Sequence, residues 1–435
     1  DAGKIREFFH LIILYTIILY YDKIVKKISA KGIYISFLRG EFDMKYLVIL
    51  TDGAAGRPMD EIGGKTALEA ARMECTDDFA AHGEVGMVRT VPEGMAPGSD
   101  VANLSVMGYA PEIYHTGRSP LEAASMGIEL SPDDVAFRCN LITVSGEGDY
   151  EDLIIKDHSS GDISNEEAAQ LIYFIDENLG TENIRFYPGV SYRHAMIVHN
   201  GSEDCELTPP HDVLDQKVGL HLPKGNDSGY ITDLMKKSYA LLKDHPVNTA
   251  RMERGLNPAN TIWIWGQGRK PSLTPFREKY GISGTVISAV DLIKGIAICA
   301  GLESVDVEGA TGTIRTNFEG KAQAAVDAFR RGSEFVYIHL EAPDECSHQG
   351  SVTEKIESLE LIDRKIVRPV TDYLKSTGED FRLLVLPDHP TPVCLRTHSP
   401  EPVPYVLYDS RKDSGQRENR YTEACGRQGK ICFEE

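Results

Sequence analysis

One aspartate and two histidines have a spacing that suits a metal ion. Asp344 and His348 lie four residues apart in the segment Asp-Glu-Cys-Ser-His, and His398 follows further along the chain in Arg-Thr-His-Ser-Pro. A carboxylate and two imidazoles can hold a divalent metal and leave a position open for substrate. These three residues form a first candidate set of ligands.

A second candidate set consists of Asp52, Asp388 and His389. Asp52 lies in Thr-Asp-Gly after an apolar run, and Asp388 and His389 are adjacent in Leu-Pro-Asp-His. Each motif alone is weak, because an aspartate before glycine is common in turns and a lone Asp-His pair is usually structural. The combination of both sets along one chain is the specific signal.

Ser99 is the candidate nucleophile. It follows Pro97 and Gly98, where a turn can present its hydroxyl at the N-terminus of a helix. A serine hydroxyl is a weak nucleophile unless a base or a metal removes its proton. No G-x-S-x-G elbow surrounds Ser99. The sequence therefore favours a serine activated by metal over a Ser-His-Asp triad.

These residues need a scaffold that brings distant segments together, and the apolar patterning predicts one. Four short apolar runs predict strands at 45–50, 335–340, 381–386 and 404–408. Helical patterns at 320–331 and 354–374 alternate with them, which is typical of an α/β fold with a mostly parallel sheet. Asp52, Asp344 and Asp388 each follow one of the first three runs. Because ligands bind outside the carboxyl ends of parallel strands, we expect these carboxylates to converge.

The pattern changes between about residues 116 and 284, where polar turns are frequent and long apolar strands are few. A strand is predicted at 262–265, and the glycine-rich segment 266–270 is expected to be a tight turn after it. We therefore expect a discontinuous core of residues 44–115 and 285–435, with an α+β cap of residues 116–284 inserted into it.

Composition excludes some classes of function. The chain has 435 residues and a formal net charge of −20, from 46 Lys and Arg against 66 Asp and Glu. A nucleic-acid binder needs a basic face, so this partner is not expected. The eight cysteines show no C-x-x-C pair, which favours free thiols and a cytoplasmic location.

The segment 8–21 is apolar and flanked by basic residues, but its 14 residues are fewer than the roughly 20 that span a bilayer. We expect residues 1–43 to be an extension, leader or tag with no role in the fold. An ordinary helix and a membrane signal are the alternatives, and a membrane partner is not favoured.

From Met44 to near its end, the chain resembles the archaeal-type, 2,3-bisphosphoglycerate-independent phosphoglycerate mutases of the alkaline phosphatase superfamily. The resemblance rests on KYLVILTDG (45–53), PGSDVAN (97–103), GRSPLEA (117–123), FRCN (137–140), DHSSG (157–161), YRH (192–194), DLIKG (291–295), APDECSH (342–348), PDH (387–389) and THSP (397–400). Two departures are residues 1–43, which have no counterpart in the family, and the end at Glu435, before the last helix is expected to finish.

The resemblance implies an alkaline-phosphatase-like sheet with helices on both faces and two divalent metal ions. One ion would be held by Asp344, His348 and His398. The other would be held by Asp52, Asp388, His389 and the oxygen of Ser99. Mn²⁺ is the first expectation, with Mg²⁺, Co²⁺ or Zn²⁺ as alternatives, and no bisphosphoglycerate is expected to be required.

The implied reaction is the glycolytic interconversion of 3-phosphoglycerate and 2-phosphoglycerate through a phosphoserine at Ser99. The cap would exclude water during the exchange, and His158 is the expected acid/base for the substrate hydroxyls. The expected substrate-binding residues are Asn103, Arg118, Arg138, Arg193 and Lys294, since arginine suits carboxylate and phosphate. Arg251 and Arg254 are weaker candidates.

Other reactions fit the same metal centre. A homoserine kinase-like transfer of phosphate from a nucleoside triphosphate is the main alternative. A phosphatase with a more open cap and a non-catalytic metal-binding scaffold are the remaining ones. The partner is expected to be a small phosphorylated hydroxy acid, and the sequence does not indicate an oligomeric state.

Overall fold

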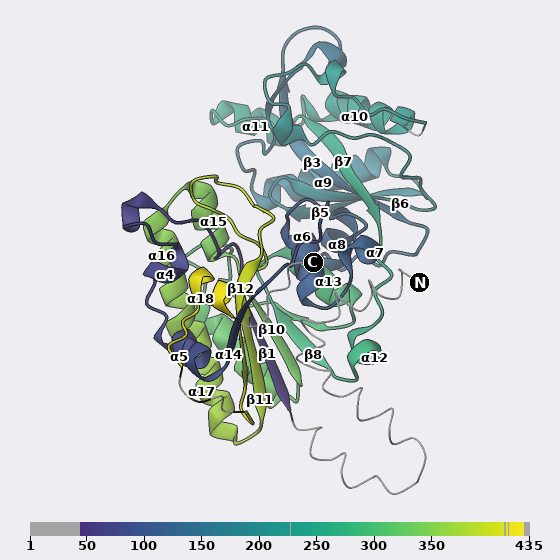
Figure 1. Ribbon diagram of the computed structural model, residues 1–435. Helices are drawn as coiled ribbons and strands as arrows, with labels where there is room; N and C mark the ends of the chain where they lie inside the picture. Colours follow the sequence, from purple (N-terminus) through teal and green to yellow (C-terminus); the bar gives the residue numbers. More distant parts are fainter. Residues whose placement is uncertain (1–43, 227, 413–414, 416, 430–435) are drawn as a thin grey trace, which may run out of the picture. The chain divides into compact units, whose positions relative to one another are not determined.

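The computed structural model describes residues 44–226, 228–412, 415 and 417–429, so the expected extension over residues 1–43 lies outside the described residues. The chain divides into two compact units (Figure 1). We call residues 44–115 with those from Ser272 onward the core unit, and Thr116–Pro271 the inserted unit. In the described part of the chain, no helix is both long and apolar enough to cross a membrane.

The core unit is built on a seven-stranded sheet in the order β2-β12-β11-β1-β10-β8-β9. Its strands are β1 (Lys45–Thr51), β2 (Glu84–Val88), β8 (Gly284–Ile287), β9 (Glu303–Val305), β10 (Phe335–Leu340), β11 (Phe381–Leu386) and β12 (Val403–Asp409). The five strands from β11 to β9 are parallel, and β12 pairs antiparallel with both β11 and β2. The predicted mostly parallel α/β fold and its four predicted strands are confirmed.

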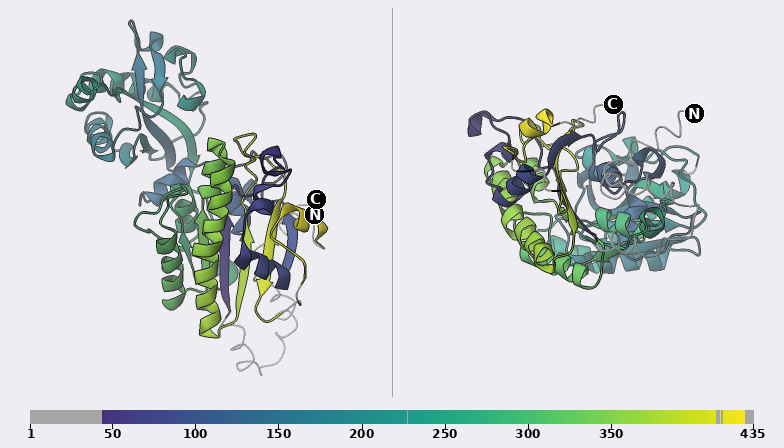
Figure 2. Two further views of the ribbon diagram at one scale, coloured as in Figure 1. Left: turned by 90° about the vertical axis from the view of Figure 1, so that its left-hand side faces the viewer. Right: turned by 60° about the horizontal axis from the view of Figure 1, so that its bottom comes forward.

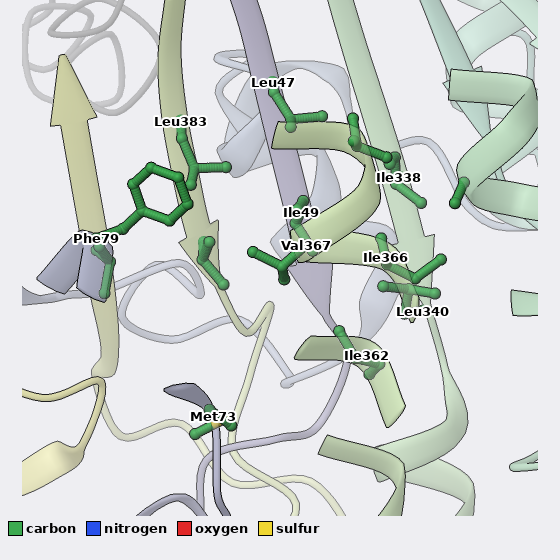
Figure 3. Close-up of a cluster of buried hydrophobic side chains, with 14 of the residues drawn as sticks. Leu47, Ile49, Met73, Phe79, Ile338, Leu340, Ile362, Ile366, Val367 and Leu383 are labelled. Carbon is green, nitrogen blue, oxygen red and sulfur yellow. The ribbon is translucent and has the colours of Figure 1, made fainter. Parts of the chain in front are cut away.

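Helices lie on both faces of this sheet (Figure 1). They are α4 (Ala67–Ala70), α5 (Glu74–His82), α6 (Ser99–Val106), α7 (Pro111–Tyr114), α12 (Phe276–Tyr280), α13 (Asp291–Cys299), α14 (Phe318–Arg330), α15 (Ala342–Gln349), α16 (Val352–Ile362), α17 (Arg368–Thr377) and α18 (Glu423–Gln428). A π-helical turn at Asp363–Val367 joins α16 to α17, and the resulting long helix runs along one face (Figure 2). Its apolar stripe packs on β1 and β10, with Ile362, Ile366 and Val367 against Ile49 and Ile338 (Figure 3).

The inserted unit has its own antiparallel sheet and its own core. The strands follow the order β4-β3-β6-β5, with β7 also paired to β3. They are β3 (Val135–Ser145), β4 (Ile154–Asp157), β5 (Ile184–Val190), β6 (Arg193–Val198) and β7 (Thr261–Arg269), and the helices are α8 (Ser119–Ser125), α9 (Asn165–Leu179), α10 (Ser228–Leu242) and α11 (Pro246–Glu253). Phe137, Ile172 and Trp263 are buried together in its core.

Two local expectations for this region differ from the structure. Residues 266–269 continue strand β7 in place of the expected tight turn, because β7 stays paired with the 11-residue β3 through a register shift. Residues 272–284, expected in the cap, lie in the core unit. There Phe276 stacks on Phe335 of β10 with ring centroids 4.8 Å apart, which fixes this segment to the parallel sheet.

Candidate metal centre and nucleophile

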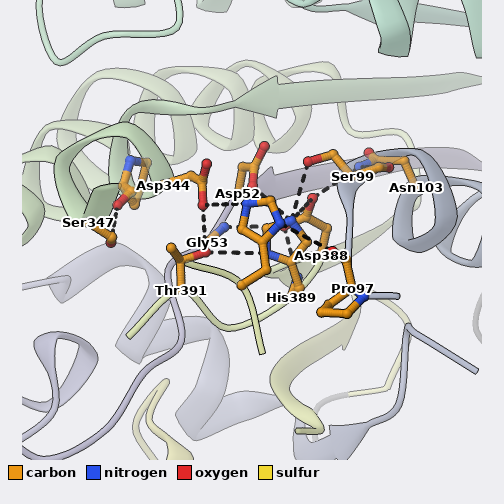
Figure 4. Close-up of polar contacts among 12 residues, drawn as sticks. Asp52, Gly53, Pro97, Ser99, Asn103, Asp344, Ser347, Asp388, His389 and Thr391 are labelled. Carbon is orange, nitrogen blue, oxygen red and sulfur yellow. Dashed lines mark hydrogen bonds and ion pairs between the residues drawn. The ribbon is translucent and has the colours of Figure 1, made fainter. Parts of the chain in front are cut away.

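The three expected aspartates follow three neighbouring strands of the core sheet. Asp52 comes directly after β1, Asp344 lies in the first turn of α15 after β10, and Asp388 follows β11. Because β10, β1 and β11 are adjacent and parallel, their carboxyl ends share one edge. The structure therefore brings the carboxylates to one place (Figure 4).

Asp344, His348 and His398 form a compact triangle. The Nε2 atom of His348 lies 3.1 Å from Asp344 Oδ2 and 3.1 Å from His398 Nε2, and His398 Nε2 lies 3.6 Å from Asp344 Oδ1. Burial acts to raise the pKa of Asp344, but hydrogen bonds from the two imidazoles hold it well below its usual range. The hydrogen bond to Asp344 raises the pKa of His348 to about 9. The candidate ligand atoms of these three residues thus lie within 3.6 Å of one another.

Asp52, Asp388 and His389 form the second group, and all three side chains are buried. His389 Nε2 lies 3.4 Å from Asp388 Oδ2 and 3.8 Å from Asp52 Oδ1. The backbone N–H groups of Gly53 and His389 donate to Asp388 Oδ1 at 3.2 and 2.8 Å, which orients that carboxylate. The two groups adjoin, because the ring of His389 stacks on that of His398 at 3.9 Å between centroids.

Ser99 is the first residue of α6, and its hydroxyl reaches the second group. Its Oγ lies 3.3 Å from His389 Nε2 (Figure 4). The preceding residue, Gly98, has an extended backbone, so the helix starts with the hydroxyl at its positive end. The structure thus brings the candidate nucleophile next to a candidate ligand.

The residues present fit divalent metal ions. The ligand atoms of Asp52, Asp388 and His389 lie within 4.8 Å of one another, and so do those of Asp344, His389 and His398. Asp52 Oδ1 is buried without a hydrogen-bond partner among the described residues. Burial, and then the charges of Asp388 and Asp344, raise the pKa of Asp52 well above its usual value. Carboxylate and imidazole ligands with an unsatisfied buried charge suit Mn²⁺ or a similar ion.

The position of Asn103 differs from the expectation that it binds substrate. Its side chain is fully buried, and both of its polar atoms have hydrogen-bond partners. Its Nδ2 donates to Ser99 O at 2.8 Å and to Asp388 Oδ2 at 3.1 Å, while its Oδ1 accepts from the Tyr337 hydroxyl at 2.6 Å. Asn103 therefore links the nucleophile helix to a ligand of the second group.

Lys355 and His339, which the sequence does not single out, lie next to the candidate ligands or the loops that carry them. The buried ammonium of Lys355 donates to the carbonyls of Gly53 at 2.8 Å and Thr391 at 2.9 Å, so α16 ties together the loops after β1 and β11. His339 lies buried on β10 with its Nε2 3.0 Å from Asp52 Oδ2. A histidine in the otherwise apolar run FVYIHL was the one available signal for this residue.

The candidates of the inserted unit lie on different elements of that unit. Arg118 is the exposed residue before α8, and Arg138 on β3 pairs with Glu122 of α8 through an Nε–Oε2 contact of 2.8 Å. His158 follows β4, and Arg193 begins β6. Arg138, His158 and Arg193 belong to one continuous row of side chains that is described below.

Three further cations are held by acidic partners. Lys294 on α13 is in the core unit, where its Nζ lies 2.6 Å from Asp306 Oδ1 and 3.7 Å from Asp291 Oδ1. Arg251 and Arg254 both pair with Glu167 of α9. Arg251 is buried, so its role is inside the inserted unit.

Comparisons with known proteins point to one family. The family model for 2,3-bisphosphoglycerate-independent phosphoglycerate mutase matches residues 80–248. A protein of that name from Methanosarcina barkeri is 48% identical over 89% of this chain and 96% of its own length. A solved structure from Pyrococcus horikoshii is 28% identical, covers 89% of this chain and 93% of its own, and has a TM-score of 0.73. The cofactor-independent phosphoglycerate mutase from Thermoplasma acidophilum is 25% identical over 89% and 95% of the two chains, with a TM-score of 0.61.

Proposed function

The chain belongs to the 2,3-bisphosphoglycerate-independent phosphoglycerate mutases, and from this premise we propose that it interconverts 3-phosphoglycerate and 2-phosphoglycerate through a phosphoserine at Ser99. One observation carries the proposal. The hydroxyl of Ser99 lies 3.3 Å from His389, which adjoins both groups of candidate ligands. A nucleophile placed beside two metal sites suits phosphoryl transfer.

Two divalent ions, with Mn²⁺ as the first expectation, complete the proposed site. Asp344, His348 and His398 would hold one ion. Asp52, Asp388, His389 and Ser99 Oγ would hold the other. When bound, such ions act as Lewis acids that lower the pKa of the serine hydroxyl and balance the charge of the phosphoryl group.

In the first half of the reaction, the deprotonated Oγ of Ser99 attacks phosphorus. A bond forms between this oxygen and phosphorus, and the bond from phosphorus to the 3-oxygen of the substrate breaks. His158 donates a proton to that leaving oxygen. The α6 backbone N–H groups near Ser99 favour the negative charge at this point, because they lie at a helix N-terminus.

In the second half, the glycerate turns so that its 2-hydroxyl meets the phosphoserine. His158 takes the proton of that hydroxyl, the 2-oxygen attacks phosphorus, and Ser99 leaves in its starting state. Each proton and bond is thereby restored. Water must be excluded during the turn, since it would hydrolyse the phosphoserine, and the inserted unit is the proposed source of that protection.

The comparisons do not favour the homoserine kinase-like alternative, since the family model and the relative from M. barkeri carry the mutase name. The test is a coupled assay of the full chain with 3-phosphoglycerate and Mn²⁺ and without bisphosphoglycerate. We expect turnover that a chelator abolishes, and a phosphate on Ser99 in acid-quenched protein by mass spectrometry. ATP consumption that depends on homoserine, without mutase turnover, would establish the alternative.

Ser99→Ala tests the nucleophile directly. We expect this variant to fold and to lose turnover and labelling together. Ser105→Ala is a matched control, because Ser105 lies on the same helix α6 and its hydroxyl has no hydrogen-bond partner among the described residues. Full activity in Ser99→Ala would refute the phosphoserine mechanism.

A cytoplasmic location is part of the same proposal. Cys75, Cys139, Cys346, Cys394 and Cys425 are free thiols, which suits a reducing compartment. The proposed partner is a small phosphorylated hydroxy acid.

A further inference from the structure

Six side chains of the inserted unit form a continuous row of cations and rings, each in contact with the next. In order along the row they are Arg138, Trp265, His211, His158, Tyr192 and Arg193. The Arg138 guanidinium lies 4.6 Å from the Trp265 ring centroid, and the Arg193 guanidinium lies 5.4 Å from that of Tyr192. The row joins three residues that the sequence predicts as functional to three that it does not.

Five separate segments build this row, so no short motif could reveal it. Arg138 comes from β3, Trp265 from β7 and His158 from the loop after β4. His211 lies in the 3-10 helix Pro210–Asp212, and Tyr192 lies in the turn between β5 and β6. All six side chains belong to the inserted unit.

Parts of the row are held in place by buried or charged partners. Arg138 is oriented by Glu122, and Trp265 Nε1 donates to the buried Asn140 Oδ1 at 3.0 Å. Near His158, the Asp157 carboxylate accepts from the backbone N–H groups of Ser159 at 2.9 Å and Gly161 at 2.6 Å. These contacts fix Arg138 and Trp265 at one end of the row and the backbone turn beside His158.

His211 and His158 occupy the middle, with ring centroids 6.1 Å apart. Their hydrogen bonding separates them from the other histidines of the inserted unit. His194, His199, His221 and His245 each have a hydrogen-bond partner. Among the described residues, neither His211 nor His158 has a hydrogen bond, and His211 has only Asp212 at 3.6 Å. Two adjacent imidazoles thus keep their ring nitrogens available.

The surroundings of His211 suit an anion. Its side chain is 47% exposed. Burial lowers the pKa of His211, the charge of Asp212 opposes this shift, and the proximity of His158, Arg138 and Arg118 lowers the pKa further. A neutral imidazole keeps one N–H donor and one acceptor, so it can bind an anionic oxygen or a hydroxyl.

We propose that His211 is a further substrate-contacting residue, which donates a hydrogen bond to an anionic oxygen of bound phosphoglycerate beside Arg138 and His158. This inference rests on the proposed mutase function and extends it to a residue on a segment that carries none of the family motifs described above. The anionic oxygen can belong to the carboxylate or to the phosphate. Both have the same chemistry toward an imidazole N–H, and the experiment separates them.

The test compares His211→Ala, His211→Gln and the control His221→Ala in the full chain. His221 is a suitable control because it lies in the same unit and bonds to Gln216 outside the row. Since a hydrogen bond to a charged group is lost, we expect His211→Ala to raise KM for 3-phosphoglycerate about tenfold or more, with a smaller fall in kcat. Glutamine retains an N–H donor, so KM of His211→Gln should lie between the values of His211→Ala and the wild type. His221→Ala should match the wild type.

Two competitive inhibitors identify the oxygen. If His211 contacts the carboxylate, His211→Ala weakens inhibition by D-glycerate. If it contacts the phosphate, the variant weakens inhibition by inorganic phosphate. Either result supports the proposal. It is overturned if KM and both inhibition constants of His211→Ala stay within twofold of the wild type.

Protection against thermal unfolding by 3-phosphoglycerate provides a readout that does not need turnover. Loss of this protection in His211→Ala, but not in His221→Ala, supports the binding role even if the wild type proves inactive as a mutase. Equal protection of all variants contradicts it. Failure of the proposed function and failure of this inference are therefore distinguishable.

Discussion

His339 Nε2 lies 3.0 Å from Asp52 Oδ2, and both side chains are buried where β1 and β10 run in parallel. The other carboxylate oxygen of Asp52 has no hydrogen-bond partner among the described residues. One oxygen is thus contacted from the interior of the sheet, and the other remains for a metal ion. His339 Nε2 makes no hydrogen bond among the described residues, so it lies against a candidate ligand without being part of either candidate set.

The first prediction is that His339→Leu weakens metal binding. Loss of a residue that orients a ligand typically lowers metal affinity by about 10–100-fold, and we expect a loss in this range for Mn²⁺. Calorimetric titration of the metal-free protein with Mn²⁺ measures it, and His339→Gln should restore part of the affinity. An unchanged dissociation constant in a folded His339→Leu protein would show that the contact does not position Asp52.

The second prediction concerns Asp52 itself. Burial and the charges of Asp388 and Asp344 raise its pKa. A raised folded-state pKa means that the folded protein binds the proton more tightly than the unfolded chain, so this group costs stability once the pH exceeds its unfolded pKa. In a chelator at neutral pH, Asp52→Asn should therefore be more stable than the wild type, by on the order of 1–2 kcal/mol.

When Mn²⁺ is added, the wild type should become more stable than Asp52→Asn. A metal ion that binds only the folded wild type at 100 times its dissociation constant stabilises it by about 2.7 kcal/mol, and Asp52→Asn should lose most of this gain. Thermal unfolding of both proteins in chelator and in Mn²⁺ gives the comparison. If the wild type is the more stable protein in chelator as well, repulsion of Asp52 by Asp388 and Asp344 does not destabilise the metal-free protein.

The third prediction separates positioning from substrate binding at Asn103. Its amide holds Ser99 O and Asp388 Oδ2 and is buried. Asn103→Ala should therefore lower kcat by about tenfold or more and leave KM for 3-phosphoglycerate within about twofold. A rise in KM at unchanged kcat would restore the original expectation that Asn103 contacts substrate.

Much of the core could be predicted from the sequence, because its signals are local. The runs at 335–340 and 381–386 are continuous and apolar, and they become β10 and β11 with the same ends. An aspartate just after a central parallel strand must reach one edge of the sheet, so the convergence of Asp52, Asp344 and Asp388 follows from topology. Local sequence patterns therefore predicted both the strands and the convergence of the three aspartates.

Other features depend on contacts between distant segments. The support of Lys355 for the loops after β1 and β11 requires a helix far along the chain, and its lysine looks like any surface cation in the sequence. His158 and His211 are neighbours in space but come from the loop after β4 and the 3-10 helix Pro210–Asp212, which no sequence periodicity relates. The burial of Asn103 could not be predicted for a similar reason, since its partners Asp388 and Tyr337 lie far from it in sequence.

The last prediction concerns Arg251, which is 2% exposed. Its guanidinium pairs with Glu167, and it donates to Ser160 O at 2.5 Å and to Asn257 O at 2.9 Å. Arg251→Leu leaves these acceptors without a buried donor, so we expect the inserted unit to lose about 2–3 kcal/mol of stability. Both tryptophans, Trp263 and Trp265, lie in that unit, so urea unfolding followed by their fluorescence reports on it directly.

Arg254→Leu is the matched control, because Arg254 pairs with the same Glu167 at the surface and should contribute less than about 1 kcal/mol. Burial opposes ionisation of Glu167, but the hydrogen bonds from Arg254 and Arg251 outweigh it and hold its pKa below the ordinary value. The stability from this lowered pKa is present above the unfolded pKa and is lost as pH falls through the folded one. The deficit of Arg251→Leu should therefore shrink below about pH 4. A deficit that is equal in both variants, or constant with pH, would contradict the assigned role.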